Sequence, residues 1–377
     1  MLRRLGRVFS TTPSSNTSHL STQVSTMSTA SATNQHLVNT TPEEWRKAIA
    51  ALPALTETEQ RIPAIFLAHG QPMLITPPEL LSDERKASLG EVQGPNGALV
   101  QFLKDLGPAL VEKYNPKAIV VLSAHWESRG GALVSDWQDE NPLLFDCQSH
   151  APNFTFTDKR RLTISSVFTD FGFHPALYKV EFHSSPDHAL SERVVHLLKS
   201  SNISARLLGP TEKRGDDGRG FRSTGLDHGV FVPFKHMFTD NCPIPIVQVS
   251  INQSLLPQDE YDLGAALEPL RSEGVLIISG GLTIHTFQDF NAFSLSKSPE
   301  IYKEFEKSII DAAAIDDPVK RKKALFDTAQ HPGFRKAHPR EEHYAPIWIA
   351  AGAADKQGGK ASTLMGHHGC KTIAFGV

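Results

Sequence analysis

Three apolar segments that each run into a histidine constrain the fold of this chain more than any other feature. They are PAIFLAHG at residues 63–70, KAIVVLSAHW at residues 117–126 and VLIISGGLTIH at residues 275–285. Each has the length and apolar character of a strand buried on both faces, and helical sequence separates the segments. This alternation predicts an α/β fold, with a central, mostly parallel or mixed sheet flanked by helices on both faces.

The remaining sequence pattern predicts further elements around these strands. Thr41 and Pro42 are typical of a helix N-cap and first helical position, and Glu43 and Glu44 suit the first turn. We expect a strand over residues 243–252 and helices over residues 99–114, 185–197, 264–271 and 302–325, the last with a break before Pro318. We find no internal repeat and no second apolar pattern, so residues 43–377 are predicted to form one domain.

Residues 1–42 differ from the rest of the chain. They are rich in Ser and Thr, contain Arg3, Arg4 and Arg7, and have no acidic residue before Glu43. This composition is that of a disordered tail or, alternatively, of a mitochondrial transit peptide. The three cysteines are widely spaced, which fits a reducing compartment. We therefore expect a cytoplasmic protein, with mitochondrial import as the alternative.

Several classes of function are disfavoured by charge and motif content. A formal net charge of −3 gives no basic footprint for nucleic acid, and no apolar run is long enough to predict a membrane span. The chain also lacks a phosphate-binding P-loop, a zincin helix, a nucleophile elbow and any C-x-x-C pair. A bound metal would therefore be held by nitrogen and oxygen ligands.

Histidines are the main candidate functional residues. His69, His125 and His285 each lie at the carboxyl end of a predicted strand, where ligands bind in open parallel α/β sheets. Imidazoles that converge on a rigid scaffold most often bind a metal ion. One histidine in such a turn is by itself more often structural, but a structural role is harder to argue for His125, which ends a buried apolar strand where histidine is a poor core residue. Two glycines before His285 indicate close backbone approach beside a site.

Two further histidines lie in loops. His343 belongs to HPREEHYAPIW at residues 338–348, where His338 is expected to cap a helix and His343 to lie about one turn into it. Glu341 and Glu342 would complement the positive end of that helix. His228 follows Asp227 between Gly225 and Gly229; Asp227 is expected either to orient an imidazole elsewhere in the chain or only to support a turn.

The other histidines and two loop segments are not predicted to belong to the site. His367 and His368 are expected to be exposed to solvent, and His188, His196 and His236 have no strand-end context. Residues 213–220 (KRGDDGRG) are predicted to be a surface loop. Residues 147–170 lack clear periodicity and are predicted to be an insertion.

Five short motifs together resemble the class III extradiol ring-cleaving dioxygenases, in the branch of DOPA 4,5-dioxygenase. They are AHGQPM, VVLSAHWES, GLDHGVFVPFKHMF, SGGLTIHTF and EEHYAPIWIAAGAA, in the order of the family, and they span roughly residues 60–377. The resemblance implies an oxidoreductase of aromatic compound catabolism that opens a catechol-type ring with O2. It also implies one divalent metal ion per chain, zinc or non-haem Fe(II).

The resemblance further implies roles for matched residues. His69, His125 and His343 correspond to metal ligands, and His285 to an acid/base catalyst that is also counted as a ligand. His228 corresponds to a second catalytic histidine that contacts substrate.

One departure from the family pattern is a divided motif. Phe145–Asp146 and residues 171–173 look like its two halves, and the intervening insertion is attributed to retained intron sequence or a gene-model error. Two other functions stay open on the same scaffold: a zinc-dependent hydrolase, since imidazole suits zinc as well as iron, and a non-enzymatic interaction protein.

Overall fold

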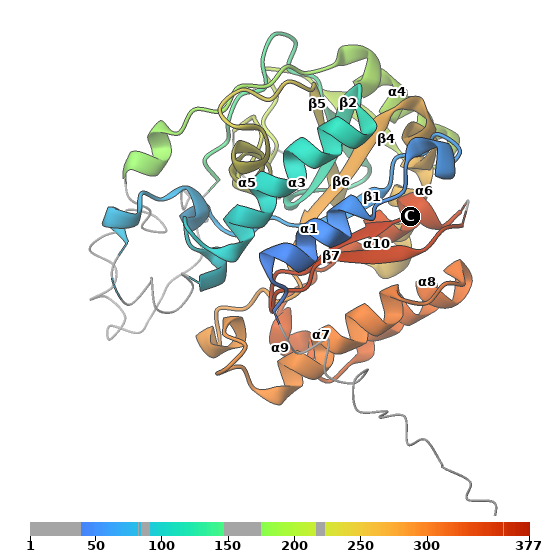
Figure 1. Ribbon diagram of the computed structural model, residues 1–377. Helices are drawn as coiled ribbons and strands as arrows, with labels where there is room; N and C mark the ends of the chain where they lie inside the picture. The colour runs from blue at the N-terminus through green and yellow to red at the C-terminus, as the bar shows by residue number, and fades with distance from the viewer. Residues whose placement is uncertain (1–38, 82, 84–90, 147–174, 216–222, 357) are drawn as a thin grey trace, which may run out of the picture. The chain divides into compact units, whose positions relative to one another are not determined.

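A mixed eight-stranded sheet forms the centre of the computed structural model, which describes residues 39–81, 83, 91–146, 175–215, 223–356 and 358–377 (Figure 1). The strand order is β4-β3-β5-β2-β6-β1-β8-β7. Neighbours from β5 to β1 are parallel, whereas β3 is antiparallel to β5 and β8 is antiparallel to β1 and β7. The strands are β1 (Ala64–Ala68), β2 (Ala118–Ser128), β3 (Ala132–Ser135), β4 (Ala205–Leu208), β5 (Ile246–Asn252), β6 (Val275–Gly281), β7 (Ala361–Met365) and β8 (Thr372–Phe375).

Helices cover both faces of this sheet, and alternate strand residues supply the two cores. Phe66 and Val120 point into one core, with α4 (His188–Ser200), α6 (Pro257–Leu267) and α10 (Pro346–Asp355). Ile65 and Val121 point into the other, with α1 (Pro42–Ala50), α3 (Ala98–Tyr114) and α5 (His228–Phe238). Outside α10 lie α7 (Glu300–Ala313) and α8 (Pro318–Asp327), and α9 (Phe334–Ala337) follows. The predicted α/β architecture is confirmed, with the mixed form of the sheet.

Most predicted elements form close to their expected positions, but the helix expected over residues 264–271 begins at Pro257 and continues from Glu268 as a 3-10 helix. Thr41 caps α1 through a capping box with Glu44, and the break before Pro318 separates α7 from α8. The helix expected from residue 185 begins only at His188, because Asp187 is its N-cap and its carboxylate accepts a hydrogen bond from the backbone N–H of Leu190. The tail and transit-peptide interpretations of residues 1–42 fall almost entirely outside the described residues. The insertion at residues 147–170 falls outside them completely.

Candidate active site

Three neighbouring strands bring the first two histidines together. His69 directly follows β1 and His125 lies in β2, and β6 runs between these two strands, parallel to both. β6 ends at Gly280 and Gly281, where a Cβ atom on Gly281 would come within 2.4 Å of the carbonyl oxygen of His343. The missing side chain therefore lets the backbone of His343 close over the end of β6, as the glycine pair predicted.

His125 owes its direction to an irregularity in β2. The pairing of β2 with β5 shifts between Leu122 and Glu127, so that His125 lies in a stretch that departs from regular register. Such bulges commonly turn a side chain toward a site. On the other side, a Cβ atom on Gly229 would lie 2.9 Å from Ser123 Oγ, so this glycine lets α5 pack closely against β2.

His343 reaches the site from a turn, and the helix expected to start at His338 does not form there. The helix α10 begins only at Pro346, and residues 341–345 form a turn in which the backbone N–H of Ala345 donates to the carbonyl of Glu341. His338 instead ends α9 and is buried, with Nε2 3.0 Å from the carbonyl oxygen of Thr283. The expectation that Glu341 and Glu342 complement a helix dipole is therefore wrong.

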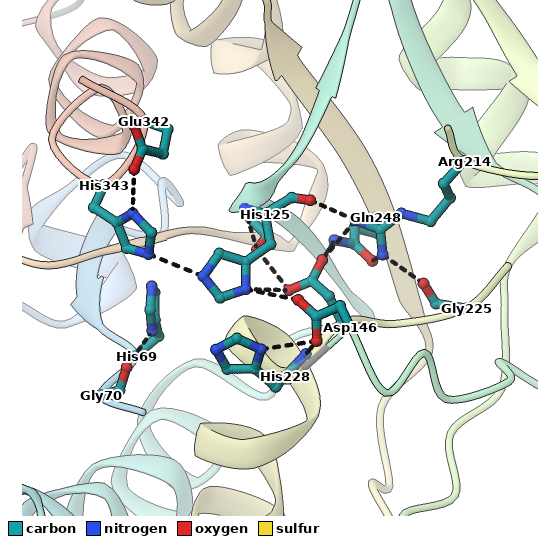
Figure 2. A network of polar contacts seen from close by, with 12 residues as sticks. His69, Gly70, His125, Asp146, Arg214, Gly225, His228, Gln248, Glu342 and His343 are labelled. Atoms are coloured by element: carbon teal, nitrogen blue, oxygen red, sulfur yellow. Dashed lines mark hydrogen bonds and ion pairs between the residues drawn. The ribbon is translucent and has the colours of Figure 1, made fainter. Parts of the chain in front are cut away.

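The structure brings three of the predicted ligands into one cluster (Figure 2). One nitrogen each from His69, His125 and His343 lies within 4.8 Å of the other two. The Nε2 atoms of His125 and His343 are 2.9 Å apart, and the ring centroids of His69 lie 5.0 Å and 5.2 Å from those of His125 and His343. We call these three residues the inner histidines.

The inner histidines fit a bound cation. Each directs Nδ1 at an oxygen: the Gly70 carbonyl at 2.7 Å, Asp146 Oδ2 at 3.0 Å and Glu342 Oε1 at 3.1 Å, for His69, His125 and His343 respectively. The Asp146 oxygen lies off the line of the His125 N–H bond. Nδ1 of His69 and of His343 is hydrogen-bonded to an oxygen and Nδ1 of His125 lies beside a carboxylate, which leaves the Nε2 atoms to face the cluster. Metal-binding histidines typically have this arrangement.

Two observations support that fit. Within the described part of the chain, the buried His69 Nε2 atom has no hydrogen-bond partner. Burial, reinforced by neighbouring imidazoles, also holds the pKa of His69 and of His343 well below the ordinary value of 6.5, which favours neutral rings. Neutral imidazole is the form that binds a metal.

His228 and His285 flank the cluster, and we call them the outer histidines. Each lies beside a carboxylate that an inner histidine also contacts. Asp146 Oδ1 lies 2.8 Å from His228 Nδ1 and accepts a hydrogen bond from the backbone N–H of His228 at 3.0 Å. Glu342 Oε1 lies 3.7 Å from His285 Nδ1, and the His285 ring stacks on His343 with centroids 3.5 Å apart. His285 therefore lies beside the inner cluster, and burial lowers its pKa to about 3.

A buried ion pair supports His125 from behind. Arg214 Nη2 lies 2.7 Å from Asp227 Oδ2, and Ser123 Oγ donates to Asp227 Oδ1 at 2.7 Å. Asp227 Oδ1 is 3.7 Å from His125 Nδ1, beyond hydrogen-bond distance, while the carboxylate beside His228 is that of Asp146. Asp227 thus lies beside the imidazole of His125 without a hydrogen bond to it, and its carbonyl accepts from the backbone N–H of Val230 in the turn that opens α5. In the predicted surface loop at residues 213–220, Lys213 is exposed as expected but Arg214 is buried; residues 216–220 are outside the described part.

Sequence reasoning missed Asp146 and Glu342 as parts of the site. Asp146 is predicted only as half of a divided motif, and its position beside a strand histidine is visible only in the three-dimensional structure.

The prediction that His367 and His368 are exposed is wrong, because both are buried and His368 Nδ1 lies 2.5 Å from Glu306 Oε2. His188 is exposed and pairs with Asp136, and His236 contacts the Leu74 carbonyl.

Comparisons with known proteins agree with this geometry. Residues 63–377 match the family described as the catalytic LigB subunit of aromatic ring-opening dioxygenase. A 4,5-DOPA dioxygenase extradiol-like protein of Schizosaccharomyces pombe is 39% identical over 334 residues, which cover 89% of this chain and 97% of the relative. The 4,5-DOPA dioxygenase extradiol of Beta vulgaris is 27% identical, covering 77% and 85%, and that of Escherichia coli is 25% identical, covering 79% and 87%.

A solved structure shows the same fold. The crystal structure of an uncharacterized Escherichia coli K12 protein superposes with a TM-score of 0.53 at 22% identity, over 84% of this chain and 100% of the other. Among the described residues, no helix combines the length and apolar character needed to cross a membrane.

The fold, the histidine cluster and these relatives define an extradiol ring-cleaving dioxygenase, an oxidoreductase that acts on an aromatic substrate with O2. The chain belongs to the family of the catalytic LigB subunit of aromatic ring-opening dioxygenases, whose members use a metal. The family and the dioxygenase relatives support ring cleavage over the two other functions that the sequence left open.

Proposed function

We propose that this enzyme opens the ring of a catechol-type substrate beside its two hydroxyl groups, on one Fe(II) ion held by His69, His125 and His343. The observation that carries the proposal is the convergence of three imidazoles, each of which has an oxygen within 3.1 Å of its Nδ1 atom. Imidazole ligands suit zinc and iron alike, but zinc has no redox chemistry. We therefore assign Fe(II) to turnover, while zinc would occupy the same ligands without supporting it.

The chain's own residues would bind the substrate and move its protons. A bound ferrous ion would hold catechol and O2 together, which removes most of the entropic cost of their encounter. His285, at the edge of the cluster, is placed to accept a proton from a catechol hydroxyl and to return it during ring opening. His228, with Nδ1 on Asp146, is oriented to contact the substrate through Nε2. Both atoms of O2 enter the product, so no further reductant is consumed.

Anaerobic reconstitution of the purified protein with Fe(II), followed by oxygen uptake with a panel of catechols, tests the proposal. We expect one O2 consumed per catechol, a yellow ring-opened product, and both oxygen atoms of 18O2 in that product. The zinc-loaded protein should bind its metal and consume no oxygen. Ring opening that persists after all metal has been chelated would contradict the proposal.

A further inference from the structure

Asp146 is a buried carboxylate that lies between two histidines of different proposed roles. Its side chain is 2% exposed, and its two oxygens are divided between neighbours. Oδ2 is 3.0 Å from Nδ1 of His125, and Oδ1 is 2.8 Å from Nδ1 of His228. Oδ1 also accepts the backbone N–H of His228, which fixes the first residue of α5 to Asp146 (Figure 2).

We propose that Asp146 is a positioning residue that holds His125 and His228 as Nδ1-protonated tautomers, so that one carboxylate orients both a metal ligand and the second active-site histidine. This inference rests on the proposed function, because it assigns Nε2 of His125 to the metal and Nε2 of His228 to the substrate side. A deprotonated carboxylate has no proton to donate. Each imidazole nitrogen that faces Asp146 must therefore carry the proton, and the opposite nitrogen carries the lone pair.

The contacts of Asp146 with His125 and His228 require an acceptor oxygen on each side of residue 146. The two Nδ1 atoms face different oxygens of Asp146, and in an amide one of these oxygens is replaced by an NH2 group that cannot accept. Asp146→Asn can therefore satisfy one histidine and must present a donor to the other. Asp146→Ala satisfies neither. A residue needed only for packing would tolerate the isosteric amide.

The first experiment uses the wild-type protein. Long-range 1H–15N NMR of the metal-free, 15N-histidine-labelled chain reports the tautomer of each ring, and His125→Gln and His228→Gln variants assign the two signals. We expect both rings to be Nδ1-protonated. An Nε2-protonated tautomer at either ring would overturn the proposal, whatever the metal content or activity of the enzyme.

The second experiment compares variants by metal competition, with zinc against a chromophoric chelator. We expect Asp146→Asn and Asp146→Ala to weaken zinc binding by about 10–100-fold, the loss typical of removing a partner that orients a ligand. Asp136→Asn is the matched control, because Asp136 Oδ2 lies 3.0 Å from Nδ1 of His188 at a surface pair away from the site. It should leave zinc affinity unchanged. Circular dichroism melting of each variant separates loss of folding from loss of orientation.

The outcomes distinguish this proposal from the proposed function. If the Asp146 variants fold and bind zinc as tightly as wild type, the positioning role is wrong while the ligand assignment stands. If His125→Ala also binds zinc as tightly as wild type, the ligand assignment itself fails. Two zinc ions per chain, one of them lost in Asp146→Ala, would show that Asp146 binds a cation and not two N–H groups.

Discussion

The two carboxylates that join inner to outer histidines differ in how firmly the fold holds them. Asp146 comes from a distant part of the chain, is nearly inaccessible, and contacts both of its histidines within 3.0 Å. Glu342 adjoins His343 in sequence, is 16% exposed, and lies 3.1 Å and 3.7 Å from its two histidines. We call each carboxylate with its two histidines a bridge. The Asp146 bridge is tight because its contacts are short and buried, and the Glu342 bridge is loose because its contacts are longer and more exposed.

The electrostatic surroundings of the two carboxylates differ in the same direction. Burial alone would raise the pKa of Asp146, but His228 and His125 hold it well below its ordinary value of 3.8. For Glu342 the effect of burial prevails and raises the pKa above 4.5, although Arg340 at 3.4 Å partly opposes it. The comparison indicates that the Asp146 side is built as a permanently charged support. The Glu342 side contributes less to the geometry of its histidines.

The largest expected effect is on metal affinity, which should depend on the inner histidines and not on the outer histidine His285. His125→Ala removes a proposed ligand, so metal affinity should fall by more than about 100-fold, beyond the loss expected for an orienting partner. His285→Ala should keep its metal and lose about 10²–10⁴-fold in turnover, the range of a general acid/base. Metal content after dialysis and oxygen uptake with a catechol measure the two quantities. Full metal occupancy in His125→Ala would show that His125 is not a metal ligand.

The next effect concerns the support behind His125. Arg214→Met leaves Asp227 charged and buried without its main partner, which should lower the free energy of unfolding by about 3–5 kcal/mol. The matched control is Arg206→Met, since Arg206 and Glu212 form an exposed pair with the same 2.7 Å separation. That change should cost less than about 1 kcal/mol. Urea unfolding of the metal-free proteins gives both values, and equal losses would show that burial of the Arg214 pair is unimportant.

A third prediction concerns the loop that carries His285. Thr283 donates a hydrogen bond to the buried Glu306, and His368 and Lys371 flank the same carboxylate. Burial alone would raise the pKa of Glu306, but Lys371 and His368 lower it from 4.5 to about 2. Because the folded-state pKa is depressed, this stabilisation is complete above about pH 4.5 and disappears as the pH falls toward 2. Its size is on the order of 3 kcal/mol at neutral pH.

Urea unfolding of wild type and Glu306→Gln between pH 6 and pH 3 measures this effect. The difference in unfolding free energy between the two should narrow as the solution becomes more acidic. Glu304→Gln, on the exposed side of the same helix, is the matched control and should stay close to wild type. A Glu306→Gln difference that does not change with pH would contradict the assignment.

The difference between the two bridges also shows what the sequence could predict. Periodicity and strand-end position placed His69 and His125 near one another, because parallel strands order their carboxyl ends along one edge. The direction of His125 depends on a shift in pairing between β2 and β5, which has no local signal in residues 122–127. Asp146 contacts His228, which lies 82 residues further along the chain. A pattern in the sequence alone could not reveal this contact.

The C-terminal errors have a related cause. Pro339 and the two acids after it are good signals for a helix start, but Pro346 begins the helix instead, and the acids serve His343 and Arg335. His367 and His368 were expected to be exposed because they lie near the C-terminus. They are buried by Thr40 and Glu306, which lie in distant segments of the chain.

The smallest expected effect tests the loose bridge directly. In Glu342→Gln the side-chain oxygen can still accept from Nδ1 of His343, and the lost charge is partly exposed, so metal affinity should weaken by no more than a few-fold, or about 1 kcal/mol. Glu341→Gln is the control, because Glu341 pairs with Arg335 and not with the cluster. Chelator competition on these variants and on Asp146→Asn ranks the bridges on one scale. If Glu342→Gln loses as much affinity as Asp146→Asn, then the shorter contacts and deeper burial of Asp146 do not control how its histidine binds metal.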